Sequence, residues 1–111
     1  MGAKFYNPTK RIVITRGDTG RGKLTLRMDG IPYEMQEGDE IHVGVKRDYS
    51  DQECLIRKTY TENPFTLHIE PQDTKSLDFG TYVWDAELVR ANGDTYTFVV
   101  KKEFVVTEEV V

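Results

Sequence analysis

The stretch "DFGTYVW", residues 78–84, decides the fold class of this 111-residue chain. A glycine-containing turn leads into a run in which apolar residues alternate with others, at Tyr82, Trp84, Ala86 and Leu88. A period of two places one face of a β-strand on a core. We therefore predict that Trp84 is a core anchor that packs with Tyr82, Leu67 and Leu88. The alternative, a tryptophan that stacks on a ligand, is disfavoured by the apolar residues at plus and minus two.

The same period of two recurs along most of the chain. The other alternating sets are Leu24, Leu26 and Met28; Ile41, Val43 and Val45; Phe65, Leu67 and Ile69; and Tyr96, Phe98 and Val100. Shorter β-rich pieces stand at 11–15, 54–60 and 103–107. Asn92-Gly93 is the strongest hairpin signal, because both residues tolerate positive φ. The one helical candidate is "PQDTKSL", 71–77, which starts at a proline.

These patterns predict an all-β fold, namely an immunoglobulin-like antiparallel β-sandwich of about seven to nine short strands. A small barrel is the alternative. The pattern at 78–84 favours the sandwich, because immunoglobulin-like domains carry it at the start of their sixth strand, where the tyrosine hydroxyl bonds back across the corner. We expect a single domain at 12–111, preceded by an N-terminal extension at 1–11.

Composition narrows the classes of partner. The formal net charge of −4 and the pI near 5.2 disfavour nucleic acid and anionic membrane surfaces, since both attract a basic face. No apolar run is long enough to suggest a secretory signal or a membrane span. The single cysteine, Cys54, begins a β-rich piece in phase with Ile56, so we expect a buried structural thiol.

The stretch "TRGDTGRGKLT", residues 15–25, contains two motifs that could carry a function. Gly17 to Lys23 reads G-x-x-x-x-G-K, but Leu24 stands where a phosphate-binding loop has Ser or Thr, and a strand pattern follows instead of a helix. Arg16-Gly17-Asp18 is the tripeptide that integrins bind. A turn between two strands is the favoured interpretation, in which the glycines supply positive-φ positions; an adhesive role stays open.

Candidates for chemistry elsewhere are weak. His68 and Glu70 share a strand face but form only a two-residue pair, and the acidic residues of the 48–53 loop match no calcium-loop spacing. The remaining candidates lack a catalytic context: His42, Ser50 and Ser76. We therefore expect no enzyme, no catalytic or metal residues, no cofactor and no small-molecule substrate.

Several segments, taken in order, resemble small phage and prophage tail proteins. They are "ITRGDTG" (14–20), "YEMQEGDEIHVGVKRD" (33–48), "IEPQDTKSLDFGTYVWDAELVRANGDTYT" (69–97) and "FVVTEEV" (104–110). Together they are similar to the N-terminal domain of siphophage baseplate upper proteins, over roughly residues 12 to 110. The resemblance implies an immunoglobulin-like module without catalysis, a virion component made in the bacterial cytoplasm.

Under this resemblance the partners would be other phage structural proteins, and a homo-oligomer is possible. Baseplate upper proteins continue into further domains that project host-binding proteins, and this sequence ends at Val111. The segment "FVVTEEVV", 104–111, has apolar residues on both phases, so we hypothesise an edge strand or tail that docks on a neighbour. The alternative function is a cell-surface or carbohydrate-binding β-sandwich module, which would need an exposed aromatic platform.

Overall fold

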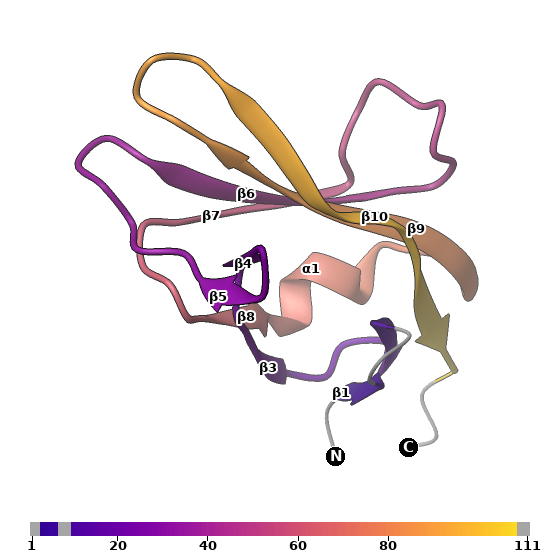
Figure 1. Ribbon diagram of the computed structural model, residues 1–111. Helices are drawn as coiled ribbons and strands as arrows, with labels where there is room; N and C mark the ends of the chain where they lie inside the picture. Colours follow the sequence, from indigo (N-terminus) through magenta and orange to yellow (C-terminus); the bar gives the residue numbers. More distant parts are fainter. Residues whose placement is uncertain (1–2, 7–9, 109–111) are drawn as a thin grey trace.

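A computed structural model describes residues 3–6 and 10–108, which form an all-β structure with one short helix (Figure 1). Its elements are β1 Ala3–Tyr6, β2 Arg11–Thr15, β3 Gly20–Leu24, β4 Arg27–Met28, β5 Ile31–Pro32, β6 Glu40–Lys46, β7 Ile56–Tyr60, β8 Phe65–Ile69, α1 Pro71–Lys75, β9 Gly80–Val89 and β10 Thr95–Thr107. The predicted helix at 71–77 is confirmed as α1, with Pro71 at its start.

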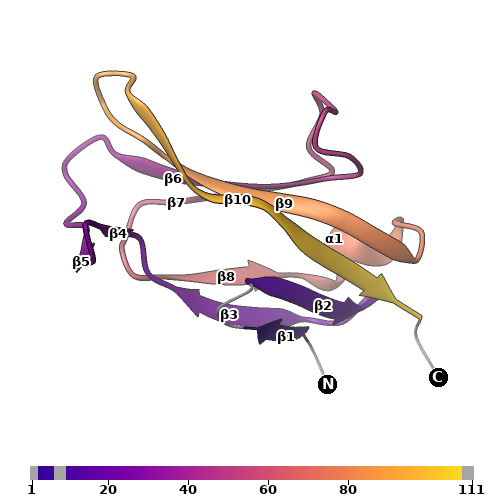
Figure 2. The same cartoon turned by 45° about the vertical axis from the view of Figure 1, so that its right-hand side comes forward.

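Six strands form one curled sheet in the order β1-β2-β10-β9-β6-β7, and β3 pairs separately with β8. Figure 2 shows two layers, with β6, β7, β9 and β10 in one and β1, β2, β3 and β8 in the other. The sheet curls because β2 pairs with the C-terminal end of β10 and so continues into the second layer. The apolar core fills the space between the layers.

The predicted tyrosine corner is confirmed. The Tyr82 hydroxyl donates to the carbonyl oxygen of Asp78 at 2.7 Å, and the Arg47 guanidinium donates to the same hydroxyl at 3.0 Å. Gly80, between Asp78 and Tyr82 in the chain, has a φ of 144°, a backbone conformation that residues with a side chain rarely adopt. The corner thus fixes where β9 begins and which of its residues face inward.

Trp84 is the core anchor that the sequence predicts. Its side chain is 2% exposed and lies in one apolar cluster with Tyr82, Leu67 and Leu88. The indole Nε1–H donates to the backbone carbonyl of Lys10 at 2.9 Å, which satisfies the ring's polar atom inside the core. A tryptophan placed this way cannot stack on an external ligand.

The hairpin predicted at Asn92-Gly93 is confirmed as the connection between β9 and β10. Within that pair only Gly93 has positive φ, at 93°. Its amide donates to the carbonyl of Arg90 at 2.9 Å, and the Arg90 amide donates to Asp94 at 2.7 Å. The loop is therefore longer than the two-residue turn that the dipeptide suggests.

Of the strand phase expected at Tyr96, Phe98 and Val100, only Phe98 packs against the core; the expectation is wrong for the other two residues. Val99 is buried, whereas Tyr96 and Val100 are 45% and 48% exposed. The register with β9 shifts between Thr97 and Val99 and again before Lys102. Each β-bulge adds a residue, so the inward phase changes along β10.

The C-terminal segment is not an edge strand, in contrast to our expectation. Residues 104–107 end β10 and lie between β9 and β2, with Phe104 and Val106 buried. Their pairing with β2 is parallel, so the sheet is not purely antiparallel. Val110 and Val111, the other apolar residues of the hypothesised tail, lie outside the described residues.

The strand expected through Leu24, Leu26 and Met28 is interrupted. The Asn63 side chain accepts from the Leu26 amide at 2.8 Å and donates to the Leu26 carbonyl at 3.0 Å, so an amide side chain replaces a strand neighbour here. The same amide also donates to the carbonyl of Tyr33 at 2.6 Å. Leu26 is buried, but β3 has already ended and β4 begins at the next residue.

Two of the glycines in the 15–25 stretch serve close packing and not turn geometry. Only Gly17 of the three has positive φ. A Cβ on Gly20 would lie 2.6 Å from the Ala3 side chain, and one on Gly22 would lie 2.5 Å from the Phe5 ring. Strand β1, part of the segment expected to be an extension, therefore packs against β3 while it pairs with β2.

We predict that Tyr82→Phe lowers the free energy of unfolding by about 1–2 kcal/mol, because it removes the hydroxyl that donates to the Asp78 carbonyl and accepts from Arg47. Urea unfolding measures the change. Tyr96→Phe, at an exposed position, is the matched control and should stay within about 0.5 kcal/mol of the unaltered protein. Equal losses in the two variants would contradict the role of the corner.

Candidate functional site

The Arg16-Gly17-Asp18 tripeptide forms the connection between β2 and β3 and is half-buried. The Gly17 amide donates to the Thr74 hydroxyl of α1 at 2.8 Å, and the Asp18 amide donates to Thr15 at 3.0 Å. The Arg16 guanidinium lies 4.4 Å from the centre of the Phe79 ring. This geometry holds the tripeptide against the body of the protein and favours the turn interpretation over a protruding adhesive loop.

The phosphate-loop interpretation fails on local structure. Residues 20–24 are strand β3, paired in register with β8, so no helix begins after Lys23. The backbone amides of the stretch therefore do not converge at a helix N-terminus, as a phosphate-binding loop requires.

The histidines and acidic residues singled out in the sequence do not converge. His42 Nε2 lies 2.8 Å from Glu40 Oε1 on one strand, whereas Glu70 takes part in the capping of α1. Asp51 accepts from the backbone amide of Asp48 at 3.1 Å and so stabilises its own loop. Within residues 3–6 and 10–108, no group of three or more His, Cys, Asp or Glu side chains could hold a metal ion.

The expectation of a buried thiol at Cys54 is wrong. Strand β7 begins only at Ile56, and the Leu55 amide donates to the Val45 carbonyl at 2.7 Å. The chain before β7 therefore crosses onto the outer face, the side of β6, β7, β9 and β10 that is turned away from the core. Cys54 is half-buried there, and its Sγ lies 2.8 Å from the position that a Cβ on Gly44 would occupy.

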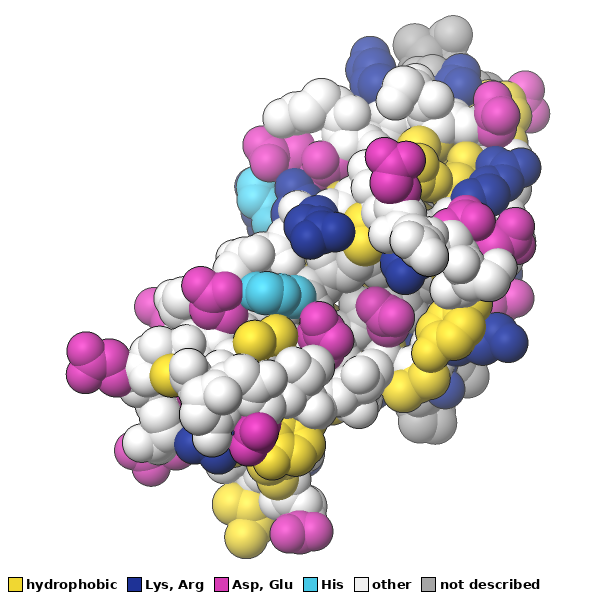
Figure 3. All heavy atoms as spheres, turned by 90° about the horizontal axis from the view of Figure 1, so that it is seen from above, with side chains coloured by type: hydrophobic (Ala, Val, Ile, Leu, Met, Phe, Trp, Pro, Cys, Tyr) yellow, Lys and Arg dark blue, Asp and Glu magenta, His cyan; other side chains and the backbone are white. Residues whose placement is uncertain are grey.

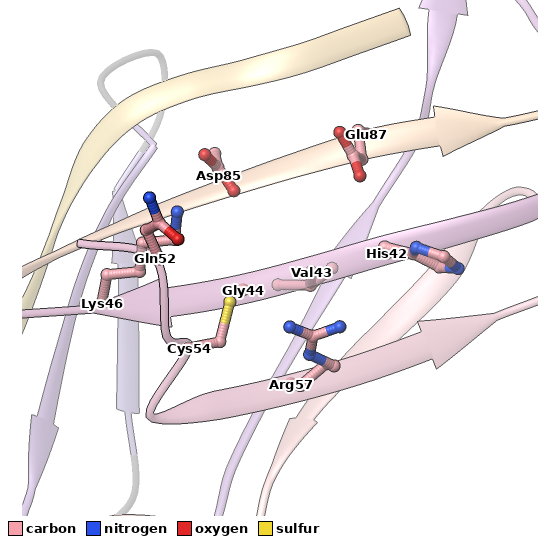
Figure 4. A pocket seen from close by; sticks show the side chains of 9 residues that line it. All are labelled: His42, Val43, Gly44, Lys46, Gln52, Cys54, Arg57, Asp85 and Glu87. Carbon is pink, nitrogen blue, oxygen red and sulfur yellow. The ribbon is translucent and has the colours of Figure 1, made fainter. Parts of the chain in front are cut away.

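A depression of about 220 Å³ surrounds this thiol on the outer face. Figure 4 shows its side chains converging from β6, β7, β9 and the loop between β6 and β7. The lining residues are His42, Val43, Gly44, Lys46, Gln52, Cys54, Arg57, Asp85 and Glu87. We call it the Gly44 pocket. Figure 3 looks down on the layer that carries it and shows acidic and basic side chains interspersed, without a large patch of one sign.

The strand register explains how charges of both signs meet in the Gly44 pocket. Gly44 pairs with Asp85 on one side and with Arg57 on the other, so the bare glycine lies between a carboxylate and a guanidinium. Asp85 Oδ1 lies 3.8 Å from the position of a Cβ on Gly44. Partial burial raises the pKa of Asp85, and the positive charge of Lys46 opposes that rise.

The chemistry available in the Gly44 pocket is ionic and hydrogen-bonding. Sequence reasoning missed this site, since Lys46, Asp85 and Arg57 are far apart in the chain and each fits the polar phase of a strand. One signal was present: Gly44 interrupts the polar phase of "IHVGVK", 41–46, and a glycine inside a strand often marks a close approach.

A second charged cluster ties loops together. Asp39 is 4% exposed and accepts from the Tyr33 hydroxyl at 2.5 Å and from the Gln36 amide at 3.0 Å. The Arg90 Nε lies 3.7 Å from its other oxygen. The Tyr33 hydroxyl, followed by the Gln36 amide, holds the pKa of Asp39 below its usual 3.8. This cluster fastens the 33–39 segment to the end of β9.

A third charged cluster joins the helix to the sheet. Lys58 on β7 lies 2.7 Å from Asp73 and 3.4 Å from Glu70, both at the start of α1. Burial lowers the pKa of Lys58, but the two carboxylates outweigh that effect and the net shift is upward. All three side chains are used in fastening α1, so this cluster offers no open binding site.

No family model, curated protein or solved structure matches this chain. Within the described part of the chain, no helix has the length and apolar character that crossing a membrane demands.

We predict that Asp39→Asn lowers the free energy of unfolding at neutral pH. The difference in the free energy of unfolding between this variant and the unaltered protein should become smaller below about pH 4. The folded pKa of Asp39 is lowered, so its stabilisation is present above the unfolded pKa and is lost as the pH falls through the folded one. Urea unfolding at several pH values measures this difference in the free energy of unfolding.

The control is Asp29→Asn, at an exposed turn position. Its free energy of unfolding should stay close to that of the unaltered protein at every pH. A loss of stability in Asp39→Asn that stays constant down to the lowest pH at which the protein is folded would contradict the assigned role of the carboxylate.

Proposed function

We propose that this chain is a non-catalytic structural or assembly module of a phage or prophage particle, in the tail or baseplate, and that it acts through protein–protein contacts. Three kinds of support converge on this proposal. They are the ordered sequence resemblance to tail proteins, the strand order, and an unpaired strand segment with exposed apolar side chains.

The strand order supports an immunoglobulin-like sandwich as the finer fold. In variable-type immunoglobulin domains one sheet runs G-F-C-C′, which the order β10-β9-β6-β7 parallels. The pair β3-β8 then corresponds to strands B and E of the other sheet. The tyrosine corner falls at the start of β9, the strand that corresponds to F.

The observation that carries the proposed role is the N-terminal half of β10. One edge of β10 is bonded to β9 along nearly its whole length, but the other edge is paired with β2 only at residues 104–107. Residues 91–97 are all exposed, and the β9–β10 hairpin projects from the body of the protein (Figure 1). Tyr96 and Val100 are large, exposed apolar residues on this unpaired half. Such a segment is suited to contact another protein.

The shape of this segment limits the kind of contact. The two register shifts in β10, together with a φ of 52° at Lys101, bend the strand and interrupt its free edge. Bulges on an edge oppose unlimited strand addition. We therefore assign the contact to side chains of the projecting hairpin, docked on a structural protein of the same particle.

The experiment that tests this function is co-expression with the proteins encoded beside it, followed by size-exclusion chromatography with light scattering. We expect a complex of defined mass. Tyr96→Ser combined with Val100→Thr should weaken it at least about tenfold, because buried apolar side chains each contribute more than 1 kcal/mol to such contacts.

The control is Ile31→Thr with Leu55→Thr, which removes two exposed apolar side chains elsewhere and should leave the complex intact. If the neighbouring proteins form no complex with the chain, the assembly role is wrong. If both double variants weaken the complex equally, the hairpin is not the contact.

A further inference from the structure

We propose that the Gly44 pocket binds a small zwitterion, whose ammonium lies against Asp85 and Glu87 and whose carboxylate lies against Arg57. This inference concerns the outer face of the sheet and goes beyond the proposed assembly role, which rests on the projecting hairpin. It follows from the register of three strands, from unpaired charges of both signs, and from the size of the depression.

The register places opposite charges two strands apart, on either side of β6. Asp85 and Arg57 stand on either side of Gly44. Neighbouring strands are about 4.8 Å apart, so the backbones that carry the two charges are separated by about 10 Å. Gly44 leaves space between them, and the Cys54 side chain occupies part of that space. Any larger residue at position 44 would collide with Cys54 Sγ, 2.8 Å from its Cβ. The place of the thiol in the depression therefore depends on this glycine.

The charges in the Gly44 pocket lack the partners that comparable charges have elsewhere. Lys58 and Asp73, outside it, form an ion pair of 2.7 Å. Within the described residues, the side chains of Arg57 and Glu87 make no hydrogen bond and no ion pair. Asp85 interacts with Lys46 only beyond ion-pair distance. Figure 4 shows the acidic pair on β9 and the guanidinium on β7, with Gly44 and the Cys54 sulfur between them.

The balance of charge selects the class of ligand. Lys46 and Arg57 contribute two positive charges, and Asp85 and Glu87 contribute two negative charges, so a ligand with both signs satisfies more groups than one with a single sign. A guanidinium fork matches the two oxygens of a carboxylate, and a partly buried carboxylate gains from an ammonium. The 220 Å³ volume limits the ligand to a small molecule.

The test is a titration of the isotope-labelled protein with 6-aminohexanoate, followed by the amide signals in nuclear magnetic resonance spectra. We expect saturable shifts at His42, Gly44, Cys54, Arg57 and Asp85, with half-saturation in the millimolar range or below. Hexanoate and hexylamine, which each lack one charge, should bind about tenfold more weakly, as expected for the loss of one charge-assisted contact.

Two variants assign the ends of the ligand. With Arg57→Gln, 6-aminohexanoate should lose about tenfold in affinity and bind no better than hexylamine; with Asp85→Asn combined with Glu87→Gln it should bind no better than hexanoate. The matched controls, Arg21→Gln and Asp29→Asn, remove exposed charges outside the pocket and should leave binding unchanged.

The unaltered protein, the two variants and the controls should all give folded spectra, since Arg57 is exposed and the Asp85 side chain accepts no hydrogen bond within the described chain. The proposal is overturned by an absence of saturable shifts, by shifts confined to other surfaces, or by equal binding of the singly charged compounds.

Discussion

The structure depends on the burial of one face of β9. Tyr82, Trp84, Ala86 and Leu88 are each no more than 2% exposed, and β9 pairs with β10 on one side and β6 on the other. A slip of one residue would turn Trp84 outward and bring charged residues into the core. The bond from the Tyr82 hydroxyl to Asp78 opposes that slip, because it fixes the start of the strand.

The same constraint produces both of the surfaces that we interpret functionally. Because one phase of β9 faces the core, Asp85 and Glu87 face outward beside Gly44, where they line the pocket. Because β9 runs to Val89 and turns at Gly93, the first half of β10 extends beyond the reach of β2.

The sequence was sufficient where strands are regular. The alternation at 41–45, 65–69 and 82–88 correctly identified residues that face the core, and the corner at 78–82 was legible from a short motif. The sequence was insufficient where the backbone is bonded by a residue that is distant in the chain. Leu26 leaves its strand because the Asn63 side chain takes the place of a neighbour, and the bulges of β10 depend on its pairing with β9.

The Gly44 pocket could not be predicted for the same reason, because only the register of β6, β7 and β9 brings its lining residues together. Gly44 was a signal of close approach, but nothing in the sequence places Cys54 over it or Arg57 and Asp85 beside it. The C-terminal strand was misplaced because apolar residues on both phases suit a central strand as well as an exposed tail. Its parallel pairing with β2 is a long-range contact.

The most direct test of the account is the fluorescence of Trp84, the single tryptophan, during urea unfolding with circular dichroism recorded in parallel. The account predicts a blue-shifted native emission that moves to the red in one transition, coincident with the loss of β-structure, because the indole is packed between the layers of a single core. A native emission as red as that of free tryptophan in water, or a shift that precedes the loss of β-structure, would contradict it.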